Sequence, residues 1–274
     1  MIRFDDRVVL VTGAGRGLGA AYARAFAARG AKVVVHDAGV ERDGSGGDPS
    51  IAQAVADEIG GVAFFDDLDE PSAGTHLVEH AFERFGQLDV VVQNAGLVIW
   101  EELDAADRSW DRMRRVSIDA PFQITRAAFP AMKEQGYGRF VFTTSGRAMS
   151  VERTRPGLAA YAVAKMAAVG LMFVTAAEGE PHGILANAIS PAAATRVFTG
   201  EVEPGELEPE QVVPGVLFLA SEQCTVTGKV LEAGGGEFSV GRWVSSDDVD
   251  FGREPVEPEV IAERWAEIEG VVRS

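Results

Sequence analysis

Runs of apolar residues alternate along most of the chain with stretches in which apolar residues recur every three or four positions. The runs are short and rich in β-branched residues, which is typical of buried strands, whereas the recurring spacing is typical of helices. Because the two patterns alternate, we predict an α/β fold, a doubly wound parallel sheet with helices on both faces. Strands are expected over 7–13, 32–39, 61–67, 88–96, 138–146, 184–192 and 228–236, and helices over 17–31, 51–60, 71–86, 107–135 (interrupted by Pro121 and Pro130), 157–179 and 209–222.

The end of the chain departs from this alternation. Residues 237–274 are acidic and contain one expected helix, over 257–270. We therefore predict a single domain over 1–236 and a C-terminal extension over 237–274, packed on the same domain or on a neighbouring subunit.

The overall charge narrows the classes of partner. A net charge of −17 argues against nucleic acid or an anionic membrane as a partner. No apolar run reaches the roughly 18 residues of a membrane span, and the first residues contain no apolar segment of signal-peptide type. The single cysteine, Cys224, excludes an intrachain disulfide and fits a reducing compartment, so a cytoplasmic location is expected. No metal site is predicted, because the one close histidine pair, His76 and His80, lacks a carboxylate-rich motif.

A glycine-rich loop links the first strand to the first helix. The segment "VTGAGRGLG" places Gly13, Gly17 and Gly19 there, where glycine permits a tight turn and lets phosphate groups approach backbone N–H groups. The loop indicates a nucleotide site chiefly because it follows a strand and opens a helix, since such a loop elsewhere is weak evidence.

Asp37 ends the second strand, where a carboxylate can accept hydrogen bonds from the adenosine ribose and would repel a 2′-phosphate. This position favours NAD over NADP, although Asp37 could also be an ordinary strand-end aspartate. Arg16 instead favours NADP, because its guanidinium could reach a 2′-phosphate.

Tyr161 and Lys165 are four residues apart in the helix expected over 157–179, so they share one helix face. A free tyrosine has a pKa near 10. An ammonium about 4 Å away, at an effective dielectric constant of about 20, would favour the phenolate by about 4 kcal/mol, or up to roughly three pKa units. Such a pair would suit general acid/base catalysis, but the spacing alone also arises by chance.

The motifs "TGAGRGLG", "NAG" at 94–96, a serine at the end of the strand before the tyrosine helix, "YAVAK" and "SPAAAT" occur in the order found in the short-chain dehydrogenase/reductase family, and the resemblance covers residues 5–236. It implies a Rossmann-type fold in which Tyr161 is the acid/base, Lys165 holds the nicotinamide ribose and Ser145 binds the substrate oxygen. It also implies a cofactor groove formed by Gly13, Arg16, Gly17, Leu18, Gly19, Asp37, Asp66, Asp67, Asn94, Ala95, Gly96, Tyr161, Lys165, Pro191 and Thr195, with Asp66 at the adenine and Thr195 at the carboxamide or pyrophosphate.

A narrower resemblance concerns the segments "DAGVERDGSGG", "YGRFVFTTS", "ANAISPAAATR" and "EQVVPGVLFLAS". These are similar to the (3R)-hydroxyacyl-CoA dehydrogenase parts of peroxisomal multifunctional enzymes and their bacterial relatives. That resemblance implies NAD as cofactor and 3-hydroxyacyl thioesters or some steroid alcohols as substrates.

The sequence departs from the family pattern in three places. First, Ser145 lies farther before Tyr161 than usual, so the stretch 146–157 at the substrate cleft is longer, and Ser150 is a rival for the serine role. Second, the usual proline-glycine after the sixth strand reads Pro191-Ala192.

Third, Ser117 stands where the family has an asparagine whose backbone carbonyl holds a water that relays protons to the lysine. Pro121 has no N–H group to bond the carbonyl of residue 117, so we expect that carbonyl to be free to hold the water. We therefore count Ser117 among the catalytic residues; the alternative is a decayed, inactive enzyme.

The combined prediction is an NAD-dependent oxidoreductase that interconverts a secondary alcohol and a ketone, with a 3-hydroxyacyl-CoA or a steroid-like alcohol as substrate. The short, acidic lid at 197–210 does not obviously favour coenzyme A, although Arg147, Arg153 and Arg155 could compensate. The alternatives are an NADPH-dependent ketone reductase and a nucleotide-binding sensor or scaffold without turnover. The resemblance also implies a homodimer or homotetramer formed through the helices at 107–135 and 157–179.

Overall fold

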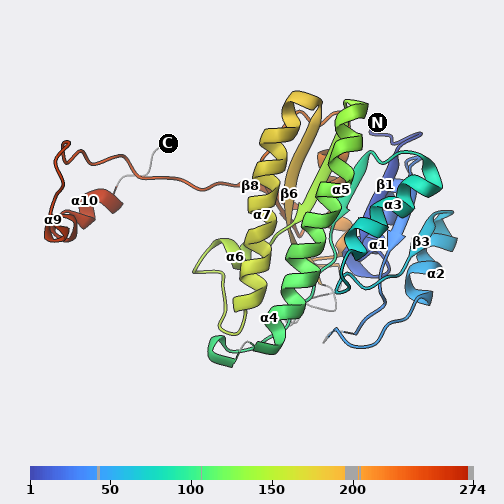
Figure 1. Ribbon diagram of the computed structural model, residues 1–274, viewed down its shortest axis with the longest axis horizontal. Coiled ribbons are helices and arrows are strands. Elements are labelled where there is room, and N and C mark those ends of the chain that lie inside the picture. Colours follow the sequence, from blue (N-terminus) through green and yellow to red (C-terminus); the bar gives the residue numbers. More distant parts are fainter. Residues whose placement is uncertain (42–43, 106, 195–202, 204, 271–274) are drawn as a thin grey trace. The chain divides into compact units, whose positions relative to one another are not determined.

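A computed structural model describes residues 1–41, 44–105, 107–194, 203 and 205–270. Its strands form one eight-stranded sheet in the order β3-β2-β1-β4-β5-β6-β7-β8 (Figure 1). The pairs from β3 through to β7 are parallel, and β4 lies beside β1 on the side away from β2. The strands are β1 Val8–Thr12, β2 Lys32–His36, β3 Val62–Phe64, β4 Val90–Gln93, β5 Gly138–Thr143, β6 Ile184–Ala192, β7 Val230–Gly234 and β8 Glu237–Gly241.

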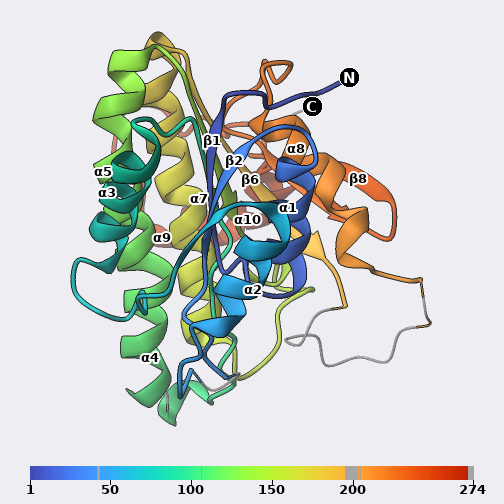
Figure 2. The same cartoon turned by 90° about the vertical axis from the view of Figure 1, so that its right-hand side faces the viewer.

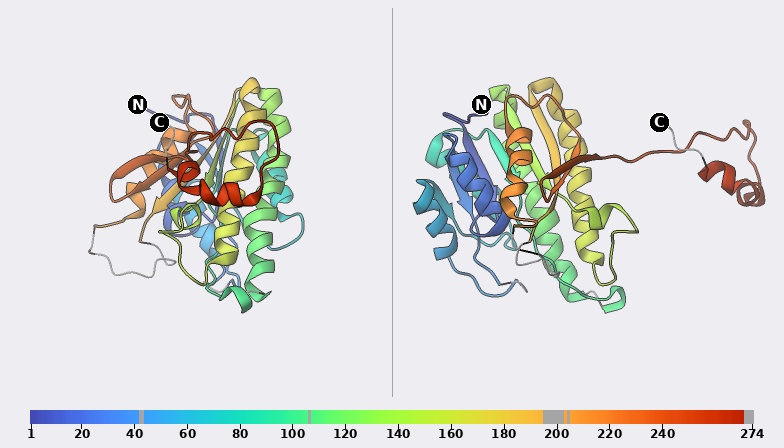
Figure 3. Two further views of the ribbon diagram at one scale, coloured as in Figure 1. Left: turned by 90° about the vertical axis from the view of Figure 1, so that its left-hand side faces the viewer. Right: turned by 180° about the vertical axis from the view of Figure 1, so that it is seen from behind.

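Helices cover both faces of this sheet, as predicted. Figure 2 shows α3, α5 and α7 on one side of the strands and α1, α2 and α8 on the other, and the views in Figure 3 show the same two layers. Apolar side chains form a separate core between the sheet and each layer. The helices are α1 Gly17–Ala27, α2 Ser50–Ile59, α3 Ala73–Phe85, α4 Asp107–Arg114, α5 Ala120–Gln135, α6 Gly146–Met149, α7 Ala159–Gly179 and α8 Val213–Ala220, with 3₁₀ turns at Leu103–Ala105, Glu180–His182 and Pro209–Gln211.

The long helical region is interrupted at a different place from the one expected. A π-helical turn, Arg115–Asp119, separates α4 from α5, and the N–H group of Ala120 bonds the carbonyl of Arg115. The prediction that Pro121 and Pro130 break the helix is wrong, because α5 contains both. Pro121 lies in the first turn of α5, where the missing N–H group is tolerated.

The α7 helix has the length and composition of a membrane span, and it is the one described helix with that property: Ala159–His182 has a mean hydropathy of 1.6. In the fold, however, α7 packs against β5 and β6, and its buried residues belong to a core of the domain. Its apolar composition is therefore that of a central helix of the domain.

The last strand lies in the stretch assigned from sequence to the C-terminal extension. β8 follows β7 after Gly235 and Gly236, a two-residue turn that makes the pair an antiparallel hairpin. Residues 1–240 form one compact unit and residues 241–274 a second. Within the second unit the helix expected over 257–270 is divided at Arg264 into α9 Pro258–Glu263 and α10 Trp265–Glu269.

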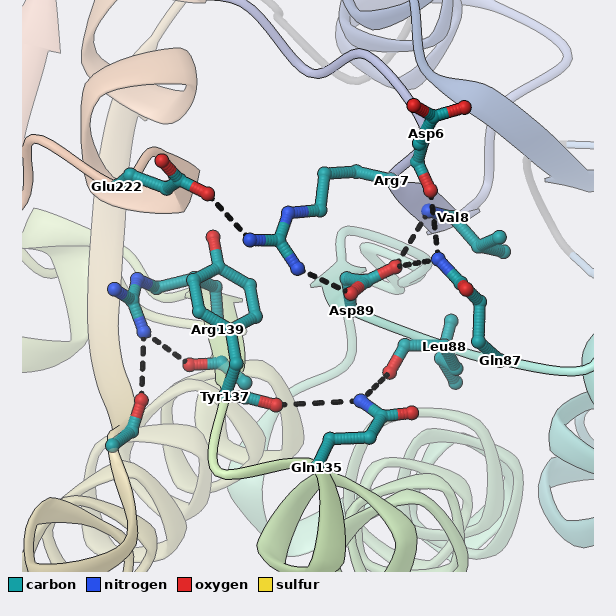
Figure 4. A network of polar contacts seen from close by, with 12 residues as sticks. Asp6, Arg7, Val8, Gln87, Leu88, Asp89, Gln135, Tyr137, Arg139 and Glu222 are labelled. Carbon is teal, nitrogen blue, oxygen red and sulfur yellow. Dashed lines mark hydrogen bonds and ion pairs between the residues drawn. The ribbon is translucent and has the colours of Figure 1, made fainter.

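A network of charged and aromatic side chains closes the edge of the sheet where the strands begin (Figure 4). The ring of Tyr137 lies between two guanidinium groups, with centroid distances of 3.9 Å to Arg7 and 4.3 Å to Arg139. Arg7 pairs with Asp89 at 2.8 Å and with Glu222. The buried Arg139 donates to three backbone carbonyls, those of Gly138, Gly183 and Ser221. These contacts satisfy polar groups at the strand starts, so they stabilise the edge of the sheet that carries no candidate site.

Candidate active site

The glycine loop follows β1 at the opposite edge of the sheet, where the strands end. Gly13 has a φ of +64°, a left-handed conformation that glycine adopts without strain. A Cβ atom on Gly19 would lie 2.0 Å from the carbonyl oxygen of Gly13, so the loop and the first turn of α1 can pack this closely only with glycine there. The loop therefore leaves its backbone N–H groups and the start of α1 available to a phosphate group.

Hydrogen bonds between the ends of β1 and β4 hold this loop in place. The hydroxyl of Thr12 accepts from the N–H groups of Asn94 and Ala95, both at 3.0 Å. The side-chain amide of Asn94 donates to the carbonyls of Thr12 and Gly13 at 3.0 and 3.1 Å. The segment "NAG" thus supports the glycine loop as well as lining the cleft beside it.

The carboxylate of Asp37 also bonds the loop. It accepts from the N–H group of Gly15 at 2.9 Å through one oxygen and from that of Gly39 at 2.8 Å through the other. Each carboxylate oxygen can accept more than one hydrogen bond, so both remain able to accept a ribose hydroxyl.

His36, the residue before Asp37, is a site residue that the sequence analysis missed. The buried imidazole accepts from the N–H group of Gly13 through Nδ1 at 3.4 Å, and its Nε2 lies 3.0 Å from the carbonyl oxygen of Asp66. Burial lowers the pKa of His36, so the imidazole is held neutral, donating from Nε2 and accepting at Nδ1. The apolar pattern of the second strand gave no indication that His36 would support the glycine loop.

A cleft of about 320 Å³ lies over these loops. Its walls fit a dinucleotide, because the glycine cradle would be filled by a Cβ atom at Gly19 and a carboxylate stands at the end of β2. Of the residues predicted from sequence to form the cofactor groove, Gly19 and Asp66 are not in its wall, and Thr195 lies outside the described residues. Those that line the cleft are Gly13, Arg16, Gly17, Leu18, Asp37, Asp67, Asn94, Ala95, Gly96, Tyr161, Lys165 and Pro191.

The two aspartates after β3 differ in their surroundings. Asp66 has an exposed side chain, and its backbone carbonyl is the group that contacts His36. Asp67 lines the cleft, and its carboxylate accepts from Arg112 at 2.7 Å. Arg112 also pairs with Asp69 at 3.0 Å and lines the same cleft, which makes it a second site residue missed from sequence.

Ser145 follows β5 and caps α6, its hydroxyl accepting from the N–H group of Arg147 at 3.2 Å. It lies in the wall of a second cleft of about 990 Å³, which also contains Tyr161. Ser150, the rival candidate, is not in the wall of either cleft, and its hydroxyl donates to Glu152. The structure thus brings Ser145, and not Ser150, together with Tyr161.

Tyr161 is the third residue of α7 and lines both clefts. Burial raises the pKa of its phenol, while hydrogen bonding to Ser145 and the positive charge of Arg147 act in the opposite direction. The phenol is therefore protonated at neutral pH in this state of the protein.

Lys165 lines the first cleft together with Tyr161. Its ammonium donates to the carbonyl of Thr143 at 3.1 Å and lies 5.8 Å from the centroid of the Tyr161 ring. The ammonium is thus held at the end of β5, and the separation of about 4 Å between the ammonium and the phenol oxygen stays a prediction. Burial lowers the pKa of Lys165 to about 8.

This arrangement coincides with a match to a known family. The family model described as short chain dehydrogenase matches residues 7–206. This range includes Ser145, Tyr161 and Lys165, the candidate reactive residues in the walls of the two clefts. The chain belongs to the short-chain dehydrogenase family.

Three relatives show how closely this dehydrogenase matches known proteins. It is 41% identical over 277 residues to peroxisomal multifunctional enzyme type 2 of Mus musculus, covering 97% of this chain but 37% of the mouse protein. It is 37% identical over 273 residues to a short-chain type dehydrogenase/reductase of Mycobacterium tuberculosis, covering 96% of this chain and 94% of that protein. A crystal structure of a short chain dehydrogenase from Mycobacterium avium has a TM-score of 0.83 at 36% identity and covers 99% of this chain and 97% of that one.

These findings confirm the predicted fold, family and reaction class. The short-chain dehydrogenase domain is an oxidoreductase that interconverts an alcohol and a ketone with a nicotinamide cofactor. The chain spans little more than a third of the length of the mouse enzyme that it matches, and its relatives include both peroxisomal and mycobacterial proteins.

Ser117 lies within the π-helical turn of this dehydrogenase and is 6% exposed. Within the described part of the chain its hydroxyl has no hydrogen-bond partner. A Cβ atom on Gly96 would lie 3.3 Å from the Lys165 ammonium and 3.8 Å from the Ser117 hydroxyl. Glycine at position 96 therefore keeps open a small space that both groups face.

We predict that His36 makes the stability of the dehydrogenase depend on pH. Its folded-state pKa is lowered, so its contribution is present above the unfolded pKa of about 6.5 and is lost as pH falls below it, by at most about 1.4 kcal/mol per pH unit. His36→Asn, which keeps an acceptor for Gly13, should flatten this dependence in urea unfolding between pH 7.5 and 5.5. The exposed control His76→Asn should retain the wild-type slope, and equal slopes for wild type and both variants would contradict the prediction.

Proposed function

We propose that this domain uses NAD in preference to NADP to interconvert a secondary alcohol and a ketone, with Ser145, Tyr161, Lys165 and Ser117 as its catalytic residues. The observation that supports this most directly is the position of Tyr161 where the two clefts meet, with Ser145 in the wall of one and Lys165 in the wall of the other. A cofactor and a substrate in adjacent clefts would both reach the phenol.

The bound nicotinamide would supply the hydride acceptor for oxidation and the hydride for reduction. Tyr161 then takes the hydroxyl proton of the alcohol during oxidation and returns it during reduction. Ser145 donates a hydrogen bond to the substrate oxygen as charge develops on it. Lys165 stabilises the phenolate through its charge and holds the nicotinamide ribose, from a position fixed by the carbonyl of Thr143.

Ser117 completes the proton path in this proposal. Its buried hydroxyl and the Lys165 ammonium both lie beside Gly96, so a water placed between them would be bonded by two polar groups. Pro121 cannot donate to the carbonyl of Ser117, so the π-helical turn leaves this carbonyl without its usual helical donor. Both groups of Ser117 can thus take over the part played by asparagine in relatives.

The wall of the first cleft supports the cofactor assignment. Asp37 stands at the end of β2 with its carboxylate anchored by the N–H groups of Gly15 and Gly39. A fixed negative charge there binds ribose hydroxyls and repels a 2′-phosphate. Arg16 donates to the carbonyl of Val40 at 3.5 Å and lines the same wall, which keeps NADP as the alternative.

For substrates we propose 3-hydroxyacyl thioesters or steroid-like alcohols. The second cleft is large, and apolar side chains of Val98, Trp100, Leu158 and Phe238 line it beside Ser145. We also propose a cytoplasmic location, supported by the single cysteine, Cys224, which is buried and unpaired; exclusive targeting to another compartment in a fractionation experiment would contradict it.

Replacing Tyr161 with phenylalanine is the central test of the reaction. Loss of the acid/base should lower kcat for 3-hydroxybutyryl-CoA or a steroid alcohol by about 10²- to 10⁴-fold while the Kd of NADH changes little. In the wild type, alcohol oxidation should rise with pH and ketone reduction should fall, because the raised pKa keeps the phenol protonated at neutral pH. Tight NADH binding without turnover of any alcohol, and without an effect of the substitution, would instead favour the sensor.

The cofactor assignment is tested by the Kd values of NADH and NADPH. The wild type should bind NADH more tightly, and Asp37→Ser should reduce that preference by about 10- to 100-fold because the repulsive charge is gone. Arg16→Gln is the matched control and should leave the preference in place. A wild type that prefers NADPH, and loses that preference in Arg16→Gln, would establish the NADPH-dependent reductase.

We further propose a homodimer or homotetramer. Phe122 on α5 and Val163 on α7 are 54% and 48% exposed, and a hollow lined by Leu103, Trp110 and Val163 lies beside the start of α7. Exposed apolar side chains on neighbouring helices are typical of subunit interfaces. Sedimentation velocity should give a particle of at least twice 29.1 kDa, and Val163→Glu should reduce it to the monomer; a monomeric wild type would contradict the proposal.

A further inference from the structure

The lengthened stretch 146–157 contributes cationic side chains to the wall of the second cleft. Arg147, Arg153 and Arg155 all line it, together with Glu152, Glu232 and Glu237. Arg147 lies closest in sequence to the reacting groups, two residues after Ser145, and its backbone N–H group bonds the Ser145 hydroxyl.

The charged side chains in this wall differ in the ion pairs and hydrogen bonds that they form. Arg153 pairs with Glu232 at 2.9 Å, and Arg155 donates to the backbone carbonyls of Glu152 and Thr154. The carboxylate of Glu152 accepts from the hydroxyl of Ser150. Among the residues that the structure describes, no ion pair joins Arg147 to a carboxylate.

Arg147 is nevertheless held in a defined place. Its guanidinium carbon lies 5.9 Å from the centroid of the Trp100 ring, within the range of a cation–π contact, and its side chain is half-buried. Trp100 and Arg147 line the cleft with Tyr161. A half-buried guanidinium beside an aromatic ring is a strong donor for a planar anion such as a carboxylate.

We propose that Arg147 binds an anionic group of the alcohol substrate, a carboxylate close to the reacting carbinol, so that the domain prefers hydroxy acids and keto acids over their neutral counterparts. The proposal rests on the proposed function, because it takes the second cleft as the substrate cleft, and it narrows the substrates proposed there toward free hydroxy acids, which carry the carboxylate that a thioester lacks. It gives the lengthened stretch 146–157 a role in specificity.

The net negative charge of the chain does not prevent an anion from binding at Arg147. A protein with a net charge of −17 repels an anion at a distance, but at physiological ionic strength that repulsion is screened beyond about 8 Å. Inside the cleft, Arg153 is paired with Glu232 and Arg155 is bonded to backbone carbonyls, so Arg147 is the lining arginine best able to meet an anion. The phosphates of a coenzyme A thioester are another source of negative charge, but they lie far from the reacting carbon, so the two sources can be separated.

The test compares matched probes on the complete chain. The probes are 3-hydroxybutyrate, 3-hydroxyhexanoate and 4-hydroxycyclohexanecarboxylate, each beside its methyl ester, and 3-hydroxybutyryl-CoA beside the neutral N-acetylcysteamine thioester. The wild type should have a lower KM for at least one acid than for its ester. Arg147→Met should reduce this acid-over-ester preference by about 10- to 100-fold, as expected for the loss of a charge-assisted hydrogen bond.

Two variants control the experiment. Arg147→Lys keeps the charge and should restore part of the preference. Lys133→Met removes one positive charge from an exposed position on α5, at the edge of the sheet remote from the cleft, and should leave the preference unchanged. Circular dichroism and NADH binding report whether each variant is folded.

Several outcomes would overturn the proposal. One is the absence of any acid-over-ester preference in the wild type. Another is an equal fall of kcat for acid and ester in Arg147→Met with a shifted pH profile, which would make Arg147 a positioning residue for Tyr161. A third is discrimination confined to the coenzyme A thioester.

Calorimetry separates failure of this inference from failure of the proposed function. Binding of each acid and its methyl ester is measured without turnover, in wild type and Arg147→Met. An acid preference in binding that Arg147→Met removes would support the anion site even if no alcohol were oxidised. Turnover of the esters without an acid preference in binding would refute the anion site and leave the proposed function standing.

Discussion

The site depends on the hydrogen bonds between the ends of β1 and β4. In the sheet, β2 and then β3 lie on one side of β1, and β4 and the later strands lie on its other side. At such a switch point the loops after neighbouring strands diverge and leave a crevice. Thr12 and Asn94 span it beneath the glycine loop, so the crevice has a fixed floor and backbone groups that remain available to a cofactor.

The two edges of the sheet satisfy their polar groups differently. Where the strands begin, Arg7 and Arg139 engage carboxylates, the ring of Tyr137 and backbone carbonyls, and the buried hydroxyl of Tyr137 has no partner among the described residues. Where the strands end, Ser117 keeps a buried hydroxyl without a partner among the described residues, and Lys165 is bonded by one backbone carbonyl. Unsatisfied groups cost stability, and of these two hydroxyls only that of Ser117 lies with the Lys165 ammonium beside Gly96, which is consistent with a site that other molecules complete.

Local chemistry explains what could be predicted from sequence. The glycine loop, Asp37 and the pair Tyr161 and Lys165 stand at positions fixed by strand ends and helix spacing, so their places follow from the alternation of elements. His36 and Arg112 were missed because their roles depend on partners from distant strands and loops, Asp66 and Asp67. The break expected at Pro121 was wrong for a related reason: proline interrupts a helix only where its missing N–H group is needed, and in the first turn of α5 it is not.

The surroundings of Tyr161 and Lys165 decide how the acidity of the tyrosine is set. The Lys165 ammonium lies 5.8 Å from the centroid of the tyrosine ring and donates to the carbonyl of Thr143. Burial acts on both groups and disfavours the charged form of each, raising the pKa of Tyr161 and lowering that of Lys165 to about 8. Ser145 and Arg147, which belong to the substrate side, act in the opposite direction on Tyr161 and favour the phenolate. An anion bound at Arg147 would offset that positive charge and strengthen Tyr161 as a proton acceptor, so the group that selects the substrate would also adjust the base that reacts with it.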